Sequence, residues 1–540
     1  MALQFIFGSS GSGKSHSLYK KTIEEAAMHP EKNYIVLVPE QFTMQTQKDL
    51  VMTQPNHAIL NIDVLSFGRL AYRVMEETGG NNRIVLDDEG KNLILRKIAG
   101  DYEEELTVLR GNLKKQGYIS EVKSVISEFT QYDIGEEEID SMMKEAGEGT
   151  FLYYKLSDIR KVYHGFYRYL EENYITKEEI LDLLCERIPD SSMLKGSILV
   201  MDGFTGFTPV QNRLMREFLK ICEEVKISVT IPPEEDPYVY KGPYQLFSLS
   251  KEMTTKLLKI CKEEKVEVKE AEVLNGRIPY RFRNNSPLAF LESHLFRYKR
   301  EIYKEEQEQI QIHCAVSPKQ EVEFVSGEIR RLIRENGYRF REIALIMSDP
   351  DTYADDIGTV FAGRDIPVFM DRKRSVLLNP FVDYVRSVVA MVQKGFTYES
   401  VFRFLRTNLT GFTFEEVDEL ENYVIALGIR GYKKWQEVWV RKMRGMDEEG
   451  LQRVNHLRVR FVEKIQDLSF VLRQPRKTVL DITRALYEFL VKEEMERKVK
   501  EQEKWFEKQG QLALSKEYSQ VYRIVMELFD KFVSLLGEER

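Results

Sequence analysis

The chain begins with a short apolar run that leads directly into a glycine-rich loop: Leu3-Gln4-Phe5-Ile6-Phe7-Gly8-Ser9-Ser10-Gly11-Ser12-Gly13-Lys14-Ser15. The second part of this stretch matches the pattern G-x-x-x-x-G-K-[ST], and a helical pattern follows over residues 16–27. Strand, loop and helix in this order are the context in which the motif binds nucleotide phosphates. Glycines let the backbone curl so that its N–H groups point at phosphate oxygens, and the helix N-terminus adds partial positive charge. The stretch therefore predicts an α/β fold with an ATP site.

The nucleotide ligands that this motif predicts form one continuous run: Gly8, Ser9, Ser10, Gly11, Ser12, Gly13, Lys14 and Ser15. Lys14 is expected to reach the β- and γ-phosphates, and the Ser15 hydroxyl is expected to ligate Mg²⁺.

A second strand pattern, at residues 198–201, ends in Asp202, and an acid at such a strand end holds Mg²⁺ through water in P-loop enzymes. The next residue is Gly203, which cannot take a proton or orient water. We therefore expect a site that binds ATP and Mg²⁺ but hydrolyses ATP slowly or not at all. The alternative is that Asp202 only caps a strand–helix turn.

Composition excludes several classes of protein. The chain has 540 residues, of which 43% are hydrophobic and 31% charged, as in ordinary globular proteins with more than one domain. Its net charge of −8 lacks the basic excess of many nucleic-acid-binding proteins, although a local basic groove is compatible with it. No apolar run is long enough to span a membrane, and the four widely spaced cysteines predict no zinc site. We expect a cytoplasmic protein.

Hydrophobic patterning suggests two α/β regions, each joined to a helical one. Apolar runs typical of buried parallel strands occur at 34–38, 59–64, 197–202 and 225–231. Further runs at 310–315, 343–347 and 366–370 predict strands of a second α/β unit after a charged stretch at 301–308. The predicted domains are a first α/β domain over 1–86 and 190–300, a helical insertion over 87–189, the start of a second α/β domain over 301–380, and its helical insertion over 381–540.

Several segments together resemble the AddB family, the B subunits of the bacterial AddAB helicase–nuclease. They are the phosphate loop, Val38-Pro39-Glu40-Gln41-Phe42-Thr43-Met44-Gln45, residues 65–74, residues 201–209, and Asp371-Arg372-Lys373-Arg374-Ser375 with Asn379-Pro380-Phe381. The resemblance implies a superfamily-1 helicase-like scaffold of RecA-like parallel sheets with large helical insertions. It also implies a degenerate motor, in agreement with Gly203, and an A-type partner chain with the active motor. Such a heterodimer processes DNA double-strand breaks for homologous recombination and repair, and its B-type chain scans single-stranded DNA at a duplex end for the Chi hotspot.

The resemblance also implies DNA contacts at six positions: Gln41, Thr43, Phe67, Arg69, Tyr72 and, as a further candidate, Phe207. Aromatic faces stack on unpaired bases, glutamine and arginine read base edges, and threonine bonds phosphates or bases. The family commonly has tryptophan where this chain has Tyr72, so the stacking area is smaller here. The alternative is that Phe67 and Tyr72 are core residues of an amphipathic helix. Arg372 and Arg374, in a concentrated basic patch, are hypothesised to contact backbone phosphates.

Family members are much longer and end in a nuclease domain, which carries clustered acids for Mg²⁺ and four cysteines for an iron–sulfur cluster. Neither motif occurs in this chain, so we interpret it as an N-terminal fragment and expect nuclease activity and the cluster only in the full-length protein. Three other functions remain open. They are an active ATP-driven translocase with Glu40 as the water-activating acid, a P-loop kinase of a small metabolite, and a nucleotide-gated scaffold that does not bind DNA.

Overall fold

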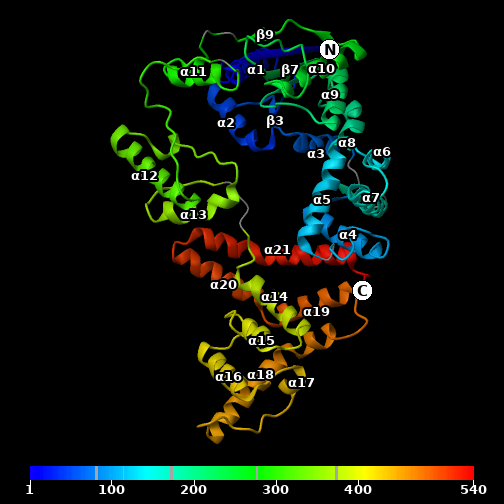
Figure 1. Cartoon of the computed structure of the whole chain (residues 1–540), viewed down its shortest axis with the longest axis vertical. Coiled ribbons are helices and arrows are strands. Elements are labelled where there is room, and N and C mark those ends of the chain that lie inside the picture. Colours follow the sequence, from blue (N-terminus) through cyan, green and yellow to red (C-terminus); the bar gives the residue numbers. More distant parts are fainter. Residues whose placement is uncertain are drawn as a thin grey trace. The chain divides into compact units, whose positions relative to one another are not determined.

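The computed structural model describes residues 1–79, 83–112, 115–170, 174–274, 276, 278–298, 300–370 and 375–539. The chain forms two compact units, Met1–Glu321 (unit 1) and Val322–Arg540 (unit 2), whose elements are labelled in Figure 1. The predicted phosphate contacts Arg372 and Arg374 lie outside the described residues. Within the described ranges, no helix combines the length and the apolar character needed to cross a bilayer.

Unit 1 contains all the strands of the described chain. Its strands are β1 (Ala2–Gly8), β2 (Tyr34–Leu37), β3 (Ile62–Leu65), β4 (Ile84–Leu86), β5 (Tyr174–Thr176), β6 (Ile198–Met201), β7 (Glu224–Thr230), β8 (Glu267–Val268) and β9 (Glu272–Val273). Its helices are α1 (Lys14–Met28), α2 (Thr43–Thr53), α3 (Phe67–Thr78), α4 (Asp88–Asp101), α5 (Gln116–Gln131), α6 (Glu136–Ala146), α7 (Phe151–Leu170), α8 (Glu179–Arg187), α9 (Pro209–Ile221), α10 (Ser248–Glu264) and α11 (Ser286–His294).

The main sheet is parallel and has the order β3-β2-β6-β7-β1-β8, with β9 also paired to β1. The central strands are buried on both faces, which explains their continuous apolar sequences. Because the strands are parallel, the loop after β1 and the residue after β6 lie at the same edge of the sheet, with β7 between the two strands. This is the α/β fold with a parallel sheet and helical insertions that the sequence predicts.

Helices cover both faces of this sheet. On one face, Leu18 and Ile23 of α1 and Leu50 of α2 pack on alternate strand residues such as Val36 and Val200. The other face is covered by α3, α8, α9 and α10. These helices pack on the strand residues whose side chains point to that face, such as Ile35. The alternation follows from the two-residue period of a strand. It leaves the carboxyl edge of the sheet to the loops that carry the predicted site.

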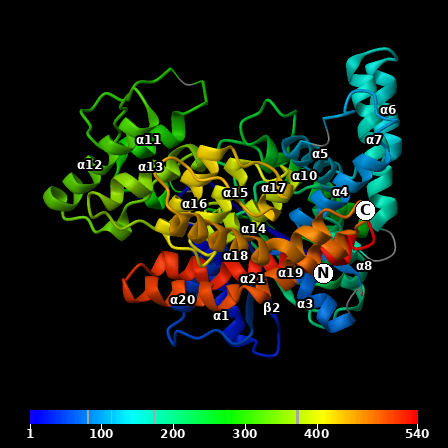
Figure 2. The ribbon, with the colours of Figure 1, turned by 90° about the horizontal axis from the view of Figure 1, so that it is seen from below.

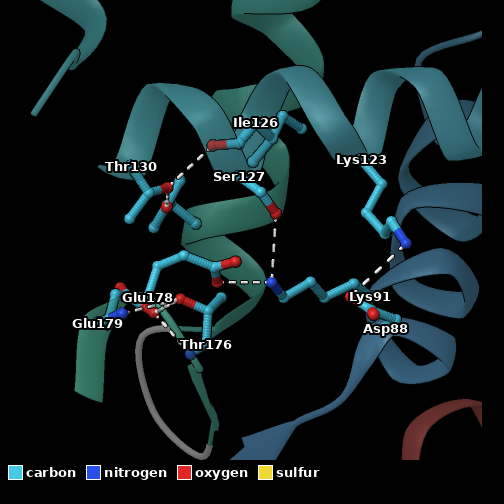
Figure 3. A network of polar contacts seen from close by, with 10 residues as sticks. Asp88, Lys91, Lys123, Ile126, Ser127, Thr130, Thr176, Glu178 and Glu179 are labelled. Carbon is cyan, nitrogen blue, oxygen red and sulfur yellow. Dashed lines mark hydrogen bonds and ion pairs between the residues drawn. The ribbon is translucent and has the colours of Figure 1, made fainter. Parts of the chain in front are cut away.

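Helices α4 to α7 with the short parallel pair β4–β5 form a mainly helical region between β3 and β6 of the main sheet. Inside it, the buried Lys91 ammonium donates to Glu178 at 2.6 Å and to the Ser127 hydroxyl at 3.3 Å (Figure 3). The pair joins α4 to the residue before α8. Because it is buried, removing either partner would leave the other charge without compensation. On the outer side of the same helices, Lys123 lies 3.6 Å from the exposed Asp88 carboxylate.

In its described residues, unit 2 consists of helices joined by loops and has no strand. Its helices are α12 (Pro318–Asn336, which begins in unit 1), α13 (Pro350–Ala362), α14 (Pro380–Gln393), α15 (Tyr398–Leu405), α16 (Phe414–Leu427), α17 (Tyr432–Gln436), α18 (Glu448–Leu472), α19 (Val479–Lys492), α20 (Met495–Lys508) and α21 (Leu512–Leu536). Helices α14 to α21 share one aromatic-rich core around Tyr384, Trp435 and Phe461. Figures 1 and 2 show α20 and α21 side by side along their lengths.

The predicted strands at 310–315, 343–347 and 366–370 were wrong: these segments form no strand in the described structure. A strand is stable only when its N–H and C=O groups pair with neighbouring strands. Here no such partner is present among the described residues, and apolar side chains of these segments face solvent, as for Ile312, Ile346 and Phe369. An apolar run indicates a tendency to be buried in a sheet, but it does not show whether neighbouring strands are present to pair with it.

We predict that Lys91→Ala lowers the free energy of local opening of α4 and α5 by about 3 kcal/mol, because it leaves the Glu178 carboxylate without its counter-ion. Hydrogen exchange followed by mass spectrometry should show the protection of these helices falling roughly a hundredfold. The matched control is Lys123→Ala, which breaks the longer pair of a half-buried lysine with the exposed Asp88 and should cost no more than about 1 kcal/mol. Equal effects of the two variants would contradict the assignment of the buried pair.

Candidate nucleotide site and DNA-facing residues

The glycine-rich loop joins β1 to α1 in the curled form that the motif predicts. Gly13 has a φ of 97°, in the left-handed region that favours glycine, and the Ser12 N–H donates to the Ser9 carbonyl at 3.2 Å. The Ser12 hydroxyl oxygen is buried and has no hydrogen-bond partner among the described residues. An unpaired buried hydroxyl is costly. The loop thus has the curl of the motif, and Ser12 carries a buried polar atom that the described residues leave unpaired.

The Lys14 side chain is buried at the base of the loop, and its ammonium donates to the Ser9 carbonyl at 2.9 Å. Burial lowers the pKa of Lys14, the nearby Asp202 carboxylate opposes this effect, and the Arg281 guanidinium reinforces it. A phosphate group bound beside Lys14 would supply negative charge and favour the charged amine. The electrostatics of the loop therefore favour an anion.

Asp202 follows β6 and is 7% exposed. The Tyr19 hydroxyl of α1 donates to one of its carboxylate oxygens at 2.7 Å, and the Ser228 hydroxyl of β7 donates to the other. Burial raises the pKa of the Tyr19 hydroxyl, and the charge of Asp202 and the hydrogen bond to it raise this pKa further. Tyr19 lines the cavity beside the loop, so it stands between that cavity and the carboxylate. Asp202 thus does not line the cavity, and Tyr19 would separate its carboxylate from a metal ion bound there.

A cavity of about 430 Å³ opens beside the loop. Its lining residues are Gly11, Gly13, Lys14, Ser15, His16, Tyr19, Asp49, Met52, Thr53 and Arg281. This volume lies in the range of small-ligand and cofactor sites. The loop and Lys14 fit a nucleoside triphosphate, and the exposed Ser15 hydroxyl at the cavity fits a ligand of Mg²⁺.

Arg281 is a residue of this site that the sequence analysis missed. It lies in the 3-10 helix Tyr280–Phe282, and its backbone N–H donates to the Gly11 carbonyl at 3.0 Å. A Cβ atom on Gly11 would lie 2.9 Å from the Cβ of Arg281, so glycine is needed for this close approach. The only signal in the sequence is a basic residue some 270 positions from the loop, which nothing local connects to a phosphate.

Three of the predicted DNA contacts are exposed at the carboxyl edge of the sheet. Gln41 lies in the 3-10 helix Glu40–Phe42 after β2, and Arg69 and Tyr72 lie on the outer side of α3 after β3. The Tyr72 ring is 55% exposed. Ser66 caps α3 by accepting a hydrogen bond from the Arg69 N–H, which fixes where this outer side begins. These residues are accessible to a DNA strand.

The other three predicted contacts are buried to different degrees. The Thr43 hydroxyl donates to the Glu40 carbonyl at 3.0 Å, and Thr43 is 4% exposed. Phe67 is 7% exposed and packs edge to face on Phe204, as the core alternative describes. Phe207 is partly buried against the same core. In this conformation, Thr43 and Phe67 position the surface residues beside them and offer no face to a base.

We predict that Gly203→Ala destabilises the region around β6 by about 1–2 kcal/mol, because Gly203 has a φ of 80° that costs a residue with a Cβ atom about this much. Asparagine tolerates this conformation better, so Gly203→Asn should cost less. The measurement is hydrogen exchange of β6 amides, since all three tryptophans (Trp435, Trp439 and Trp505) lie in unit 2 and report nothing on this region. If Gly203→Ala left the exchange of the β6 amides unchanged, the turn would have relaxed to accept the Cβ atom.

Comparison with known proteins identifies the family. A family model described as ADDB, N-terminal, matches residues 5–292. The chain is 41% identical to the B-type subunit of the ATP-dependent helicase/deoxyribonuclease from Lachnoclostridium phytofermentans, 34% to that from Caldanaerobacter subterraneus subsp. tengcongensis and 33% to that from Clostridium acetobutylicum. Each match covers 100% of this chain but 47% of the relative, so the chain spans about half the length of these curated relatives. Since the family model covers more than half of the chain, the chain belongs to the AddB family.

Proposed function

We propose that this chain is the helicase-like part of a B-type subunit of an ATP-dependent helicase/deoxyribonuclease. The names of its relatives support this function, and because they are named as subunits they also support a partner, which we take to be an A-type helicase–nuclease chain in a cytoplasmic heterodimer. Nuclease activity would belong to the part of the relatives that this chain does not match. The complex would process DNA double-strand breaks for recombination.

The observation that carries the proposal is the phosphate loop with its cavity, next to a strand end that lacks a water-activating acid. Gly203 follows Asp202, and Glu40, the candidate substitute, does not line the cavity. The Glu40 carboxylate lies 3.9 Å from where a Cβ atom of Gly68 would be, on the side of α3. We infer that the site binds ATP with Mg²⁺ through Lys14 and Ser15 and hydrolyses it slowly. Bound nucleotide would then act as a structural signal.

We predict that Lys14→Ala weakens binding of a fluorescent ATP analogue in the presence of Mg²⁺ by about tenfold to a hundredfold, because a charge-assisted hydrogen bond is worth about 1.5–3 kcal/mol. Phosphate release followed in the same samples should be negligible with and without single-stranded DNA. Fast release stimulated by DNA would instead identify an active translocase.

A second variant further distinguishes the degenerate motor from the active translocase. Asp49 is the carboxylate that does line the cavity, and its side chain accepts a hydrogen bond from Gln45 at 2.6 Å. Asp49→Asn keeps the shape and removes the charge. If any release is observed and this variant abolishes it, Asp49 is the base of a working motor. If release is absent in both proteins, the degenerate-motor proposal stands.

We further propose that the surface of Gln41, Arg69 and Tyr72 binds single-stranded DNA and reads the Chi sequence. Tyr72 provides a stacking face, whereas Gln41 and Arg69 carry groups that pair with base edges. Support comes from their exposure at neighbouring strand ends and from the deoxyribonuclease named in the relatives. A metabolite kinase has no use for such a surface, and no feature of the cavity favours one.

We predict that Tyr72→Ala weakens binding of single-stranded DNA by about 1–3 kcal/mol, the usual worth of one stacked base. Tyr72→Phe retains the ring and should bind almost as the parent chain does. Fluorescence anisotropy with a labelled oligonucleotide measures both. Loss of binding in Tyr72→Phe as well would mean that the hydroxyl, and not stacking, makes the contact.

A further inference from the structure

The segment between α16 and α18 in unit 2, residues 430–444 (the basic loop), is held in place by two buried tryptophans. Trp435 of α17 is 1% exposed and Trp439 is 5% exposed, and their rings lie 5.2 Å apart in the core of the unit. The Trp439 indole N–H donates to the Lys434 carbonyl at 2.9 Å. These anchors fix the shape of the loop, whose regular secondary structure is the short helix α17.

Side chains of the neighbouring helices bind the backbone of the loop from both sides. Asn455 of α18 accepts from the Trp439 N–H at 3.0 Å and donates to the Trp439 carbonyl at 2.7 Å. The buried Arg458 donates to the Trp435 carbonyl at 2.9 Å, and the Tyr423 hydroxyl of α16 donates to the Arg441 carbonyl at 2.6 Å. The outer side chains of the loop are therefore presented from a fixed backbone.

Those outer side chains are mostly cationic. The basic loop contains six basic residues and one acid, in a chain whose net charge is −8. Lys434 pairs with Glu437 at 2.9 Å, and Lys442 pairs with Glu448 at 2.5 Å. The other four are exposed and have no carboxylate within 4.0 Å among the described residues: Arg430, Lys433, Arg441 and Arg444.

The acids that follow the loop form no ion pair with these four cations among the described residues. Asp447 caps α18 by accepting a hydrogen bond from the Gly450 N–H at 2.7 Å, and Glu448 and Glu449 lie in the first helical turn, where negative charge is favourable. At the other end of the loop, the exposed Arg473 guanidinium lies over the Tyr432 ring, 4.3 Å from its centroid. It extends the cationic surface.

We propose that the basic loop binds the sugar–phosphate backbone of duplex DNA. It would be a second DNA contact, in addition to the surface of Gln41, Arg69 and Tyr72. The proposal rests on the proposed function, which brings DNA to this chain. Arginine provides three of the four unpaired cations, and its planar fork matches phosphate oxygens. A rigid loop loses little conformational entropy when it binds a rigid duplex.

The aromatic residues favour duplex over single-stranded DNA. Single strands are held largely by stacking of bases on exposed rings. Both tryptophans of the basic loop are buried, and Arg473 covers the Tyr432 ring. The loop thus has charge without a stacking platform, and its contacts are with phosphates and independent of base sequence.

The test uses the full chain and its Arg441→Ala/Arg444→Ala variant, with a fluorescently labelled blunt duplex titrated at several KCl concentrations. Each lost phosphate contact lowers the slope of log K against log salt concentration by about 0.9, so we expect the slope to fall by about two and low-salt affinity to fall about tenfold or more. The matched control is Arg497→Ala/Lys500→Ala on α20. These two cations are equally exposed but paired with glutamates, so duplex binding should not change.

Three results would overturn the assignment. They are an unchanged slope in the loop variant, an equal loss in the α20 control, and displacement of the duplex by polyglutamate at equal charge concentration, which would indicate an acidic protein segment as the partner. Failure of duplex binding by the parent chain would also overturn it. In that case, retained Tyr72-dependent binding of single-stranded DNA would leave the proposed function intact. Thermal unfolding of each variant confirms that the exposed substitutions leave the fold unchanged.

Discussion

The carboxylate of Asp202 connects the three elements on which the nucleotide site depends. It follows β6, accepts a hydrogen bond from Tyr19 of α1 at 2.7 Å and another from Ser228 of β7. A buried carboxylate is tolerated only when its oxygens are bonded, so these donors are a structural necessity. Through Tyr19, the charge also fixes the helix whose N-terminus forms the phosphate loop. The position of Lys14 relative to β6 therefore depends on this one side chain.

The turn after Asp202 joins the candidate nucleotide site of unit 1 to the surface of Gln41, Arg69 and Tyr72 that we propose binds DNA. A Cβ atom on Gly203 would lie 3.4 Å from Pro39 and 3.8 Å from the Phe42 ring, which flank Gln41 in the sequence. One residue further, Phe204 packs on Phe67 at the start of α3, the helix that carries Arg69 and Tyr72. In a motor, the residue after the acid activates water. Here the same turn packs against both segments proposed to contact DNA, so direct contacts connect it to each of them.

Sequence patterns predicted the parts of the molecule whose structure is determined by residues close together in the sequence. The phosphate loop, β1, β2, β6 and α3 follow from glycine positions, continuous apolar runs and helical spacing. Two kinds of feature were beyond such patterns. Arg281 reaches the site only through the tertiary fold, and the apolar runs at 343–347 and 366–370 have no strand to pair with among the described residues. The helix α3 shows the limit within one element, because Phe67 and Tyr72 have similar side chains but opposite exposure.

Net charge is a poor guide to nucleic-acid binding in a chain of this kind. Many of its cations lie beside carboxylates, for example Arg213 with Asp182 and Arg406 with Glu421, and such pairs present little net field to a phosphate. What matters is where cations are left without partners and whether their backbone is fixed. The basic loop meets both conditions because Trp435 and Trp439 occupy the core, where they hold the arginines outward. A protein with a net charge of −8 can thus bind a polyanion, since four exposed cations of the loop have no carboxylate within 4.0 Å among the described residues.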